Sequence, residues 1–247
     1  MSHQNSEKIH PYILQQHLIN QIIPLHVYQT WYTKNLPPIM NDRREELKRL
    51  NPAFTFHLYD DNDCSEFIKK HFTIQVVNAY NSLIPGAYKA DLWRCCVLFI
   101  NGGIYMDIKL LTVGGFKLIQ LTTKEHFVRD RLPNTIYNAL LVCKPRNKLL
   151  LNSINAIVRN VRKKYYGASP LDPTGPGLLG KLAMKDTGVN IDLKHNTNGG
   201  FIIYKNNFII STEYSEYDNE RSELNNKIKK ARYDTLWNKR IIYKSSI

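Results

Sequence analysis

Long hydrophobic runs, paired cysteines and stretches of low complexity are missing from this sequence of 247 residues. No run approaches the roughly 18 apolar residues that a membrane-spanning helix needs, so no transmembrane helix is expected. The four cysteines form no CxxC pair, which argues against a zinc site and favours buried, reduced thiols. The polar N-terminal segment has neither the apolar core nor the cleavage site of a signal peptide. We therefore expect a cytoplasmic protein without a transmembrane segment.

Positive charge is abundant but is not gathered into one basic segment. The net charge is +13, from 34 lysines and arginines against 21 acidic residues. A chain of this charge can bind nucleic acid, an anionic membrane or phosphate-bearing substrates. Its basic clusters, such as residues 162–164 and 227–230, are short, and no motif that reads RNA or DNA accompanies them. Nucleic acid is therefore not an expected partner.

Strand and helix patterns alternate through the first half of the chain. Period-two alternation predicts strands, and apolar residues three or four apart predict helices. The expected strands are 24–31, 54–61, 104–111 and 135–145, and the expected helices are 11–20, 41–50, 63–71, 76–84, 86–103, 148–165 and 178–185. A hairpin turning at Asn206-Asn207 and a tyrosine-rich tail follow. The alternation predicts one α/β domain over residues 23–247, after a polar extension over 1–22, with a mostly parallel sheet covered by helices on both faces.

The segment from Asn101 to Leu111, NGGIYMDIKLL, joins a two-glycine turn to a short apolar run that holds opposite charges. Residues two apart in a strand face the same side, so Asp107 and Lys109 are expected to point at one place. Two carboxylates at this spacing would favour a divalent cation and a phosphorylated ligand, but the second position here is a lysine. The residues alone leave open whether a metal binds there.

Six segments occur in a fixed order: IPLHVYQTW, NPAFTFHLYDDNDCSEFI, IPGAYKADLWRCCVLFINGGIYMDIKL, IYNALLVCKPRNKLLL, YYGASPLDPTGPGLLG and LWNKRIIYK. Over about residues 22–245 the chain thereby resembles the DXD-type sugar transferases of glycosyltransferase family 32, related to yeast initiation α-1,6-mannosyltransferase and to capsular-polysaccharide transferases. The clostridial glucosylating toxins are distant relatives of this family with the same catalytic core. The resemblance implies a GT-A fold, which is a Rossmann-like nucleotide-binding sheet. It also implies sugar transfer with retention of anomeric configuration from a nucleotide sugar, usually with Mn²⁺ or Mg²⁺.

The resemblance assigns roles around the ADLWR helix. Asp91 and Arg94 lie three apart on one helix face. Asp91 matches a family residue that binds the ribose or sugar hydroxyls, and Arg94 matches one that reaches the sugar or the phosphate. Asp107 matches the first DXD aspartate, which contacts the ribose and metal-bound water. The alternatives are a surface ion pair for Asp91 and Arg94 and a solvated strand-end acid for Asp107. If the roles hold, all three residues should line one cleft.

The first strand and the two-glycine turn supply further candidates for donor binding. Tyr28, Gln29 and Trp31 match the family's HQTW motif, with tyrosine in place of histidine, although Trp31 is equally a core candidate. Gly102 and Gly103 allow a close backbone approach and a sharp exit from the helix.

Two later segments complete the expected donor site. Thr174 and Gly175 belong to TGPG before a probable helix start, where backbone amides form a natural anion site, or merely a loop-to-helix turn. Trp237 matches a C-terminal tryptophan that approaches the diphosphate in the distant toxins, although the residues before it differ from the family's. The eight histidines show no ligand spacing and are expected to be structural or on the surface.

Lys109 stands where the family has its second, metal-binding aspartate. An ammonium only donates hydrogen bonds and repels a cation. Four outcomes stay open: Lys109 neutralises the leaving diphosphate itself, a cation binds weakly through Asp107, transfer is lost, or Lys109 faces solvent without a role.

The sequence predicts a retaining glycosyltransferase that moves a sugar from a GDP- or UDP-linked donor to a carbohydrate or other hydroxyl acceptor. Asp107 and Lys109 are the expected catalytic residues, with Asp107 also the candidate ligand of a weak or absent metal. The alternative is a catalytically inactive module of the same fold that binds nucleotide sugars or glycans.

Overall fold

The computed structural model describes residues 21–186, 188–196, 200–227 and 231–244. The helix expected over 11–20 therefore lies outside the described residues. The helices are α2 Pro38–Leu50, α3 Asp61–His71, α4 Ile74–Ser82, α5 Gly86–Asn101, α6 Lys148–Arg162, α7 Pro176–Ala183, α8 Tyr217–Lys227 and α9 Tyr233–Asn238, with a 3-10 turn, η1, at Leu118–Leu121. The strands are β1 His26–Thr30, β2 Thr55–Tyr59, β3 Gly103–Met106, β4 Leu111–Thr112, β5 His126–Arg129, β6 Ile136–Cys143, β7 Leu193–His195, β8 Phe201–Tyr204 and β9 Asn207–Ser211.

The strands form one mixed sheet in the order β2-β1-β3-β6-β5-β7-β8-β9-β4. The prediction of a mostly parallel sheet was wrong in this respect. Among the described strands, β1 pairs in parallel with β2 and β3, and β5 with β7, whereas the other five pairings are antiparallel. The strands β5 and β6, β7 and β8, and β8 and β9 follow one another in the chain without a helix between them, so each of these pairs can run antiparallel without a crossover.

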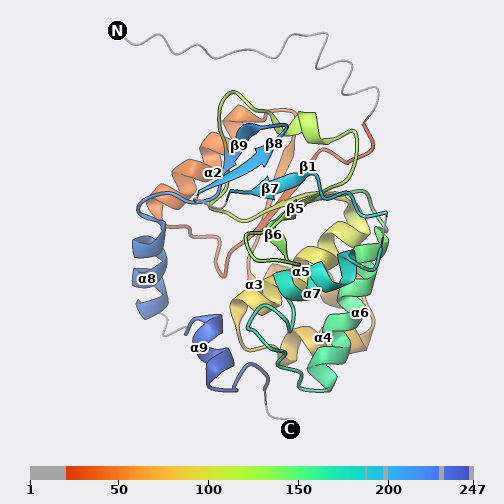
Figure 1. Cartoon of the computed structure of the whole chain (residues 1–247). Helices are drawn as coiled ribbons and strands as arrows, with labels where there is room; N and C mark the ends of the chain where they lie inside the picture. Colours follow the sequence, from red (N-terminus) through yellow and green to blue (C-terminus); the bar gives the residue numbers. More distant parts are fainter. Residues whose placement is uncertain (1–20, 187, 197–199, 228–230, 245–247) are drawn as a thin grey trace.

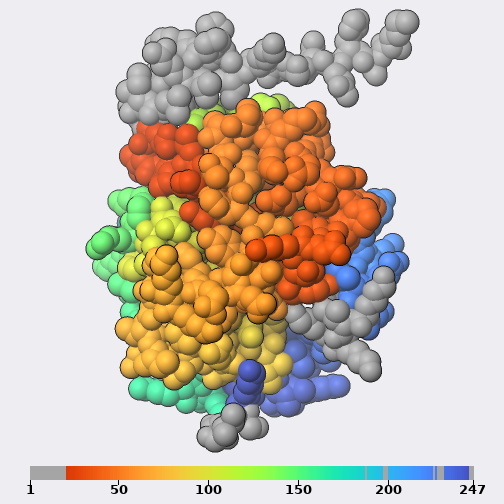
Figure 2. Space-filling view, turned by 180° about the vertical axis from the view of Figure 1, so that it is seen from behind, coloured from red at the N-terminus to blue at the C-terminus, as the bar shows by residue number. Residues whose placement is uncertain are grey.

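Helices cover both faces of the sheet, as predicted. One core lies between the sheet and α3 to α7, and a second lies between the sheet, α2 and η1. Figure 1 shows α3 to α7 gathered on one side of the sheet and α2 on the other. Figure 2 shows that the orange segment of the chain, α2 to α4, forms much of the opposite face of the molecule. The four cysteines are buried and free, as expected.

Several element boundaries differ from the predicted ones. The strand expected over 104–111 ends at Met106, and residues 108–109 form a turn before β4. The helix expected over 63–71 begins at Asp61, and its N-cap is Asp60, in a capping box with Asp63. The hairpin turns at Lys205 and Asn206, both with positive φ, rather than at Asn206-Asn207. Strands β5 and β7 were not predicted, because each is only three or four residues long.

No helix in the described part of the chain has the length and apolar character needed to cross a bilayer.

Gly102 connects α5 to β3, and its φ of 65° lies in the left-handed region. A Cβ atom there would lie 2.6 Å from Cδ of Pro145. We expect Gly102→Ala to lower the free energy of unfolding by about 2–4 kcal/mol, from backbone strain plus overpacking. Gly86→Ala is the control, because a Cβ at Gly86 meets nothing within 4 Å. Urea unfolding of both variants tests this, and equal stability of the two would contradict it.

Candidate functional site

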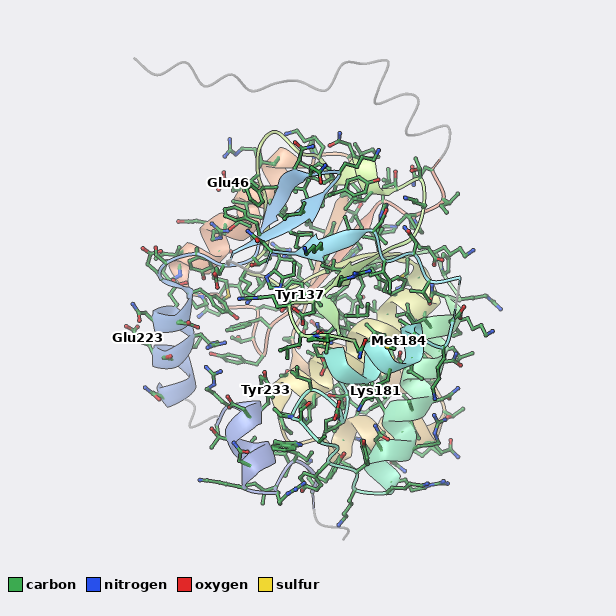
Figure 3. The ribbon with its side chains drawn as sticks, viewed as in Figure 1. Glu46, Tyr137, Lys181, Met184, Glu223 and Tyr233 are labelled. Carbon is green, nitrogen blue, oxygen red and sulfur yellow. The ribbon has the colours of Figure 1, made fainter. Side chains whose placement is uncertain are left out.

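A cavity of about 520 Å³ opens beyond the ends of β1 and β3, beside the first half of α5. Other parts of its walls come from strands β6 and β7, from α3, α4 and the loop before α7, and from the C-terminal segment around α8 and α9. Figure 3 labels Tyr137 of β6 and Tyr233 of α9, which line the cavity, and Glu223, which marks α8 beside it. Clefts of roughly 300–1,000 Å³ are usual for small-molecule ligands. The cavity contains six of the predicted site residues: Trp31, Asp91, Arg94, Asp107, Lys109 and Gly175.

Arg94 is the centre of the polar wall of this cavity. It projects from α5 and is almost fully buried, with Asp91 Oδ1 3.4 Å from Nη2 and Asp107 Oδ1 3.5 Å from Nη1. Nη1 also donates to the Asn138 carbonyl at 2.6 Å, and the guanidinium lies 4.4 Å over the Tyr105 ring. Burial disfavours the guanidinium charge, but Tyr105 and the two carboxylates outweigh it and raise the pKa of Arg94. Arg94 therefore stays charged and fixes both acids.

Asp91 is held from three sides. The Thr174 hydroxyl donates to Oδ2 at 2.8 Å and the Asn138 amide donates to Oδ1 at 2.9 Å, in addition to the Arg94 pair. Burial raises the pKa of the Asp91 carboxyl, and these partners oppose the shift. The alternative of a surface ion pair is thus excluded, because Asp91 and Arg94 are both buried beside Asp107.

Asp107 follows β3 directly and is about one-third exposed toward the cavity. Its Oδ1 accepts the Tyr105 hydroxyl at 2.7 Å, and its backbone amide donates to the Ala139 carbonyl at 2.8 Å. Among the described residues, no hydrogen bond to Oδ2 is found. The sequence prediction that Asp91, Arg94 and Asp107 line one cleft is confirmed, and Asp107 presents a carboxylate to this cavity.

Lys109 is not on a strand face with Asp107, so that prediction was wrong. The pairing of β3 with β6 ends at Met106, and the chain then turns, with the Leu110 amide donating to the Asp107 carbonyl at 3.0 Å. The Lys109 side chain nevertheless lines the same cavity, half-buried, with Nζ 5.1 Å over the ring of Tyr217. A turn, rather than strand alternation, therefore brings the side chains of Asp107 and Lys109 to the same cavity.

Two of the residues from the first strand lie behind the cavity rather than in it. Tyr28 is buried and stacks on His57 at 4.9 Å, and burial raises the pKa of its hydroxyl to about 12. Gln29 is fully buried, and neither side-chain amide atom has a hydrogen-bond partner among the described residues. Trp31, by contrast, is half-buried and lines the cavity.

Other predicted contacts have structural surroundings. Gly102 packs against Pro145 and Gly103 against the His26 carbonyl, away from the cavity lining. Thr174 reaches the site through Asp91, as described above. Trp237 donates from its indole nitrogen to the Tyr166 carbonyl at 2.7 Å and packs on the helical core instead of lining the cavity.

The start of α7 does not provide the expected anion site. Pro176 has no backbone amide to donate, and the Gly177 and Leu178 amides donate to the Leu171 carbonyl at 3.1 and 3.4 Å. Gly175 still borders the cavity. A Cβ atom at this position would lie 3.0 Å from Asp91 Oδ2, so the absence of a side chain leaves room for that carboxylate.

Several cavity residues were not predicted from the sequence. Asn138 of β6 bridges Asp91 and Arg94, and the position was visible only as part of a strand. His195 of β7 is buried, with Nδ1 3.2 Å from Asp130 Oδ1 and its ring 4.2 Å from that of Tyr137. The prediction that His195 is structural or on the surface missed its place in the lining. No spacing signal could have found it, because β5, β6 and β7 bring these residues together.

The side chains at the DXD position do not fit a divalent cation. Asp107 Oδ1 already accepts the Tyr105 hydroxyl, and Lys109 presents an ammonium where a second oxygen ligand is needed. In the described part of the chain, no group of three or more His, Cys, Asp or Glu side chains is placed to hold a metal ion.

Comparisons with known proteins agree with this architecture. Residues 37–123 match the family described as "glycosyltransferase sugar-binding region containing DXD motif". Mannosyl phosphorylinositol ceramide synthase CSH1 of Saccharomyces cerevisiae is 26% identical over 148 residues, which are 59% of this chain and 38% of that protein. Initiation-specific α-1,6-mannosyltransferase of Candida albicans is 29% identical over 37% of this chain and 25% of its own length. The matched part of this chain thus spans between 25% and 38% of the length of these curated relatives.

The fold has a solved counterpart in the PaToxG glycosyltransferase. The two chains superpose with a TM-score of 0.54 at 18% identity, over 71% of this chain and 76% of the other. The family match includes α5, β3 and the turn after Asp107, and so contains Asp91, Arg94 and Asp107. Residues 37–123 of this chain are therefore similar to the DXD-type glycosyltransferases, and the chain has a glycosyltransferase fold of GT-A type, with Asp-Ile-Lys at the position of the family's motif.

Proposed function

We propose that this protein is a retaining glycosyltransferase that uses a nucleotide-sugar donor and a carbohydrate or other hydroxyl acceptor. The observation that carries this proposal is the buried Arg94 between Asp91 and Asp107, at the wall of a cavity of suitable size. Such a cluster presents a rigid carboxylate surface for donor hydroxyls, because each acid is held by other side chains before the ligand arrives.

In the proposed reaction, the bond between the anomeric carbon and the diphosphate oxygen breaks and its electron pair stays on that oxygen. The acceptor oxygen bonds to the anomeric carbon from the same face, and its proton passes to the departing phosphate. In this proposal Asp107 Oδ2, which accepts no other hydrogen bond among the described residues, accepts a hydrogen bond from a ribose or sugar hydroxyl, and the Lys109 ammonium supplies positive charge in the same cavity. Positive charge near the leaving group lowers the barrier in a partly desolvated cleft. No step is assigned to a metal, because the donor set does not fit one.

The names of the relatives make mannosyl transfer the first reaction to test. The purified chain is incubated with GDP- and UDP-linked sugars, and release of the nucleoside diphosphate is followed with and without a mannoside acceptor. Release of the nucleoside diphosphate by the unmodified chain, and its loss in Asp107→Asn, supports the proposal. Lys109 at the second motif position favours one rival, an inactive module of the same fold, which would bind donors without releasing the diphosphate.

A binding prediction separates a diphosphate site from a nucleoside site. We expect UDP or GDP to bind at least tenfold more tightly than the matching nucleoside, because hydrogen bonds from cationic groups to phosphate are about twice as strong as neutral ones. Calorimetric titration of the four compounds measures the difference. Equal affinities for nucleoside and diphosphate would contradict a phosphate-binding site in the cavity.

A further inference from the structure

The cavity contains more positive charge than the family's motif would provide. Its described lining contains Arg94, Lys109, Arg131, Arg221 and Arg232. Arg94 is committed to its two carboxylates, and Arg232 lies 3.4 Å from Asp234. Arg131 is exposed to solvent. The remaining pair, Lys109 and Arg221, is the one that shares a common contact.

That common contact is Tyr217, in the first turn of α8. Lys109 Nζ lies 5.1 Å and the Arg221 guanidinium carbon 5.2 Å from the centre of its ring. Among the described residues, no carboxylate lies within 4 Å of the Lys109 ammonium. Arg221 lies 2.8 Å from Asp218, but that carboxylate is 78% exposed and contributes little attraction in water. Both cations are thus held beside the cavity by an aromatic ring rather than neutralised by buried acids.

Helix α8 is held to the rest of the molecule at its other side. Glu220 accepts the Ile39 amide at 3.0 Å and the Tyr214 hydroxyl at 2.7 Å. Arg43 of α2 lies 4.8 Å over the Tyr214 ring and donates to the Lys109 carbonyl at 3.4 Å. The same contacts therefore fix α8 and the turn that carries Lys109, which sets the two cations relative to each other.

The charge balance gives this pair a purpose that rests on the proposed function. A divalent cation brings two positive charges to the diphosphate of a donor, whereas Lys109 alone brings one. We propose that Arg221 of α8 supplies the second charge, so that Lys109 and Arg221 together bind the leaving diphosphate in place of a metal. Arg221 is then a donor-binding residue supplied by the tail of the chain.

The test is calorimetric titration of the full chain with inorganic pyrophosphate, UDP and GDP in the presence of chelator. Arg221→Gln is expected to weaken binding of the preferred diphosphate and of pyrophosphate about tenfold, and Arg221→Lys by less. Asp218→Asn is the matched variant, because it breaks the same surface ion pair but keeps Arg221. It should bind as the unmodified chain does. Arg49→Gln, an arginine exposed on α2, controls for net charge.

Each outcome decides the matter. Unchanged affinity in Arg221→Gln, or an equal loss in Asp218→Asn, overturns the role of Arg221 while the proposed transferase stands. Loss of diphosphate binding by the unmodified chain on chelation also overturns the metal-free pair. A chain that binds none of the three compounds overturns both this inference and the proposed function. Circular dichroism of Arg221→Gln shows whether α8 and the fold are intact.

Discussion

Replacing Arg94 with methionine is expected to lower the free energy of unfolding by about 3–5 kcal/mol, the range for breaking a buried ion pair on one side. The change leaves Asp91 buried without its cation and removes the bond to the Asn138 carbonyl. Urea unfolding at neutral pH measures the loss. Arg49→Met on the exposed surface of α2 is the matched control and should change stability by less than about 1 kcal/mol.

The pH dependence of this variant provides a second check. Burial already raises the folded-state pKa of Asp91 above its ordinary value of about 3.9, and removing Arg94 raises it further. Between the ordinary pKa of Asp91 and its raised folded-state pKa, the folded state binds more protons than the unfolded state, so the free energy of unfolding falls as pH rises through this range. The deficit of Arg94→Met should therefore shrink as pH is lowered from 8 toward 5. The double variant Asp91→Asn with Arg94→Met should recover part of the loss at neutral pH. A deficit that neither changes with pH nor responds to Asp91→Asn would mean that lost packing, not an unpaired charge, causes it.

The helix α5 and its exit into β3 could be predicted from the sequence because the signals there are local. Apolar residues at helical spacing predicted the helix, and Gly102 predicted its end. Asp91 and Arg94 lie on that helix, and Asp107 follows the adjoining strand, so their grouping follows from a few neighbouring elements. This is why the main residues of the polar wall of the cavity could be predicted.

The opposite wall could not be predicted, because its contacts join segments that are distant in sequence. His195 meets Asp130 through the parallel pairing of β5 with β7, and neither strand is long enough to show a period. Tyr217 and Arg221 lie in a tail whose composition predicted nothing specific. Their place beside Lys109 depends on the contact of α8 with α2.

The strand assigned to residues 104–111 shows how an apolar pattern misleads. Ile108, Leu110 and Leu111 are all buried, which suits a strand, but Ile108 belongs to a turn. What ends β3 is the end of its hydrogen bonding with β6, and the chain then pairs through β4 with β9. Burial was predicted correctly from composition, while direction depended on partners that composition does not specify.

Lys109→Ala is expected to weaken diphosphate binding by about 1.5–3 kcal/mol, the range for hydrogen bonds to charged groups. The unmodified chain should bind its donor equally well with Mn²⁺ and with chelator, because the ammonium in the cavity opposes a cation there. Lys148→Ala, an exposed lysine on α6, is the control and should bind as the unmodified chain does. If Lys109→Ala changes nothing, Lys109 is a bystander.

Lys109→Asp should have a different effect, because it restores the family's pair of carboxylates at this turn. Donor binding by this variant is expected to become dependent on Mn²⁺. With chelator, its affinity should be as low as that of Lys109→Ala or lower, and addition of Mn²⁺ should restore it. The turn places residue 109 beside the same cavity as Asp107, so an oxygen at that position can face the same ligand. Titration of the donor into the unmodified chain and both variants, each with Mn²⁺ and with chelator, gives six affinities that decide the matter. Metal dependence in the unmodified chain, or its absence in Lys109→Asp, would show that the charge at residue 109 does not determine how the leaving diphosphate is neutralised.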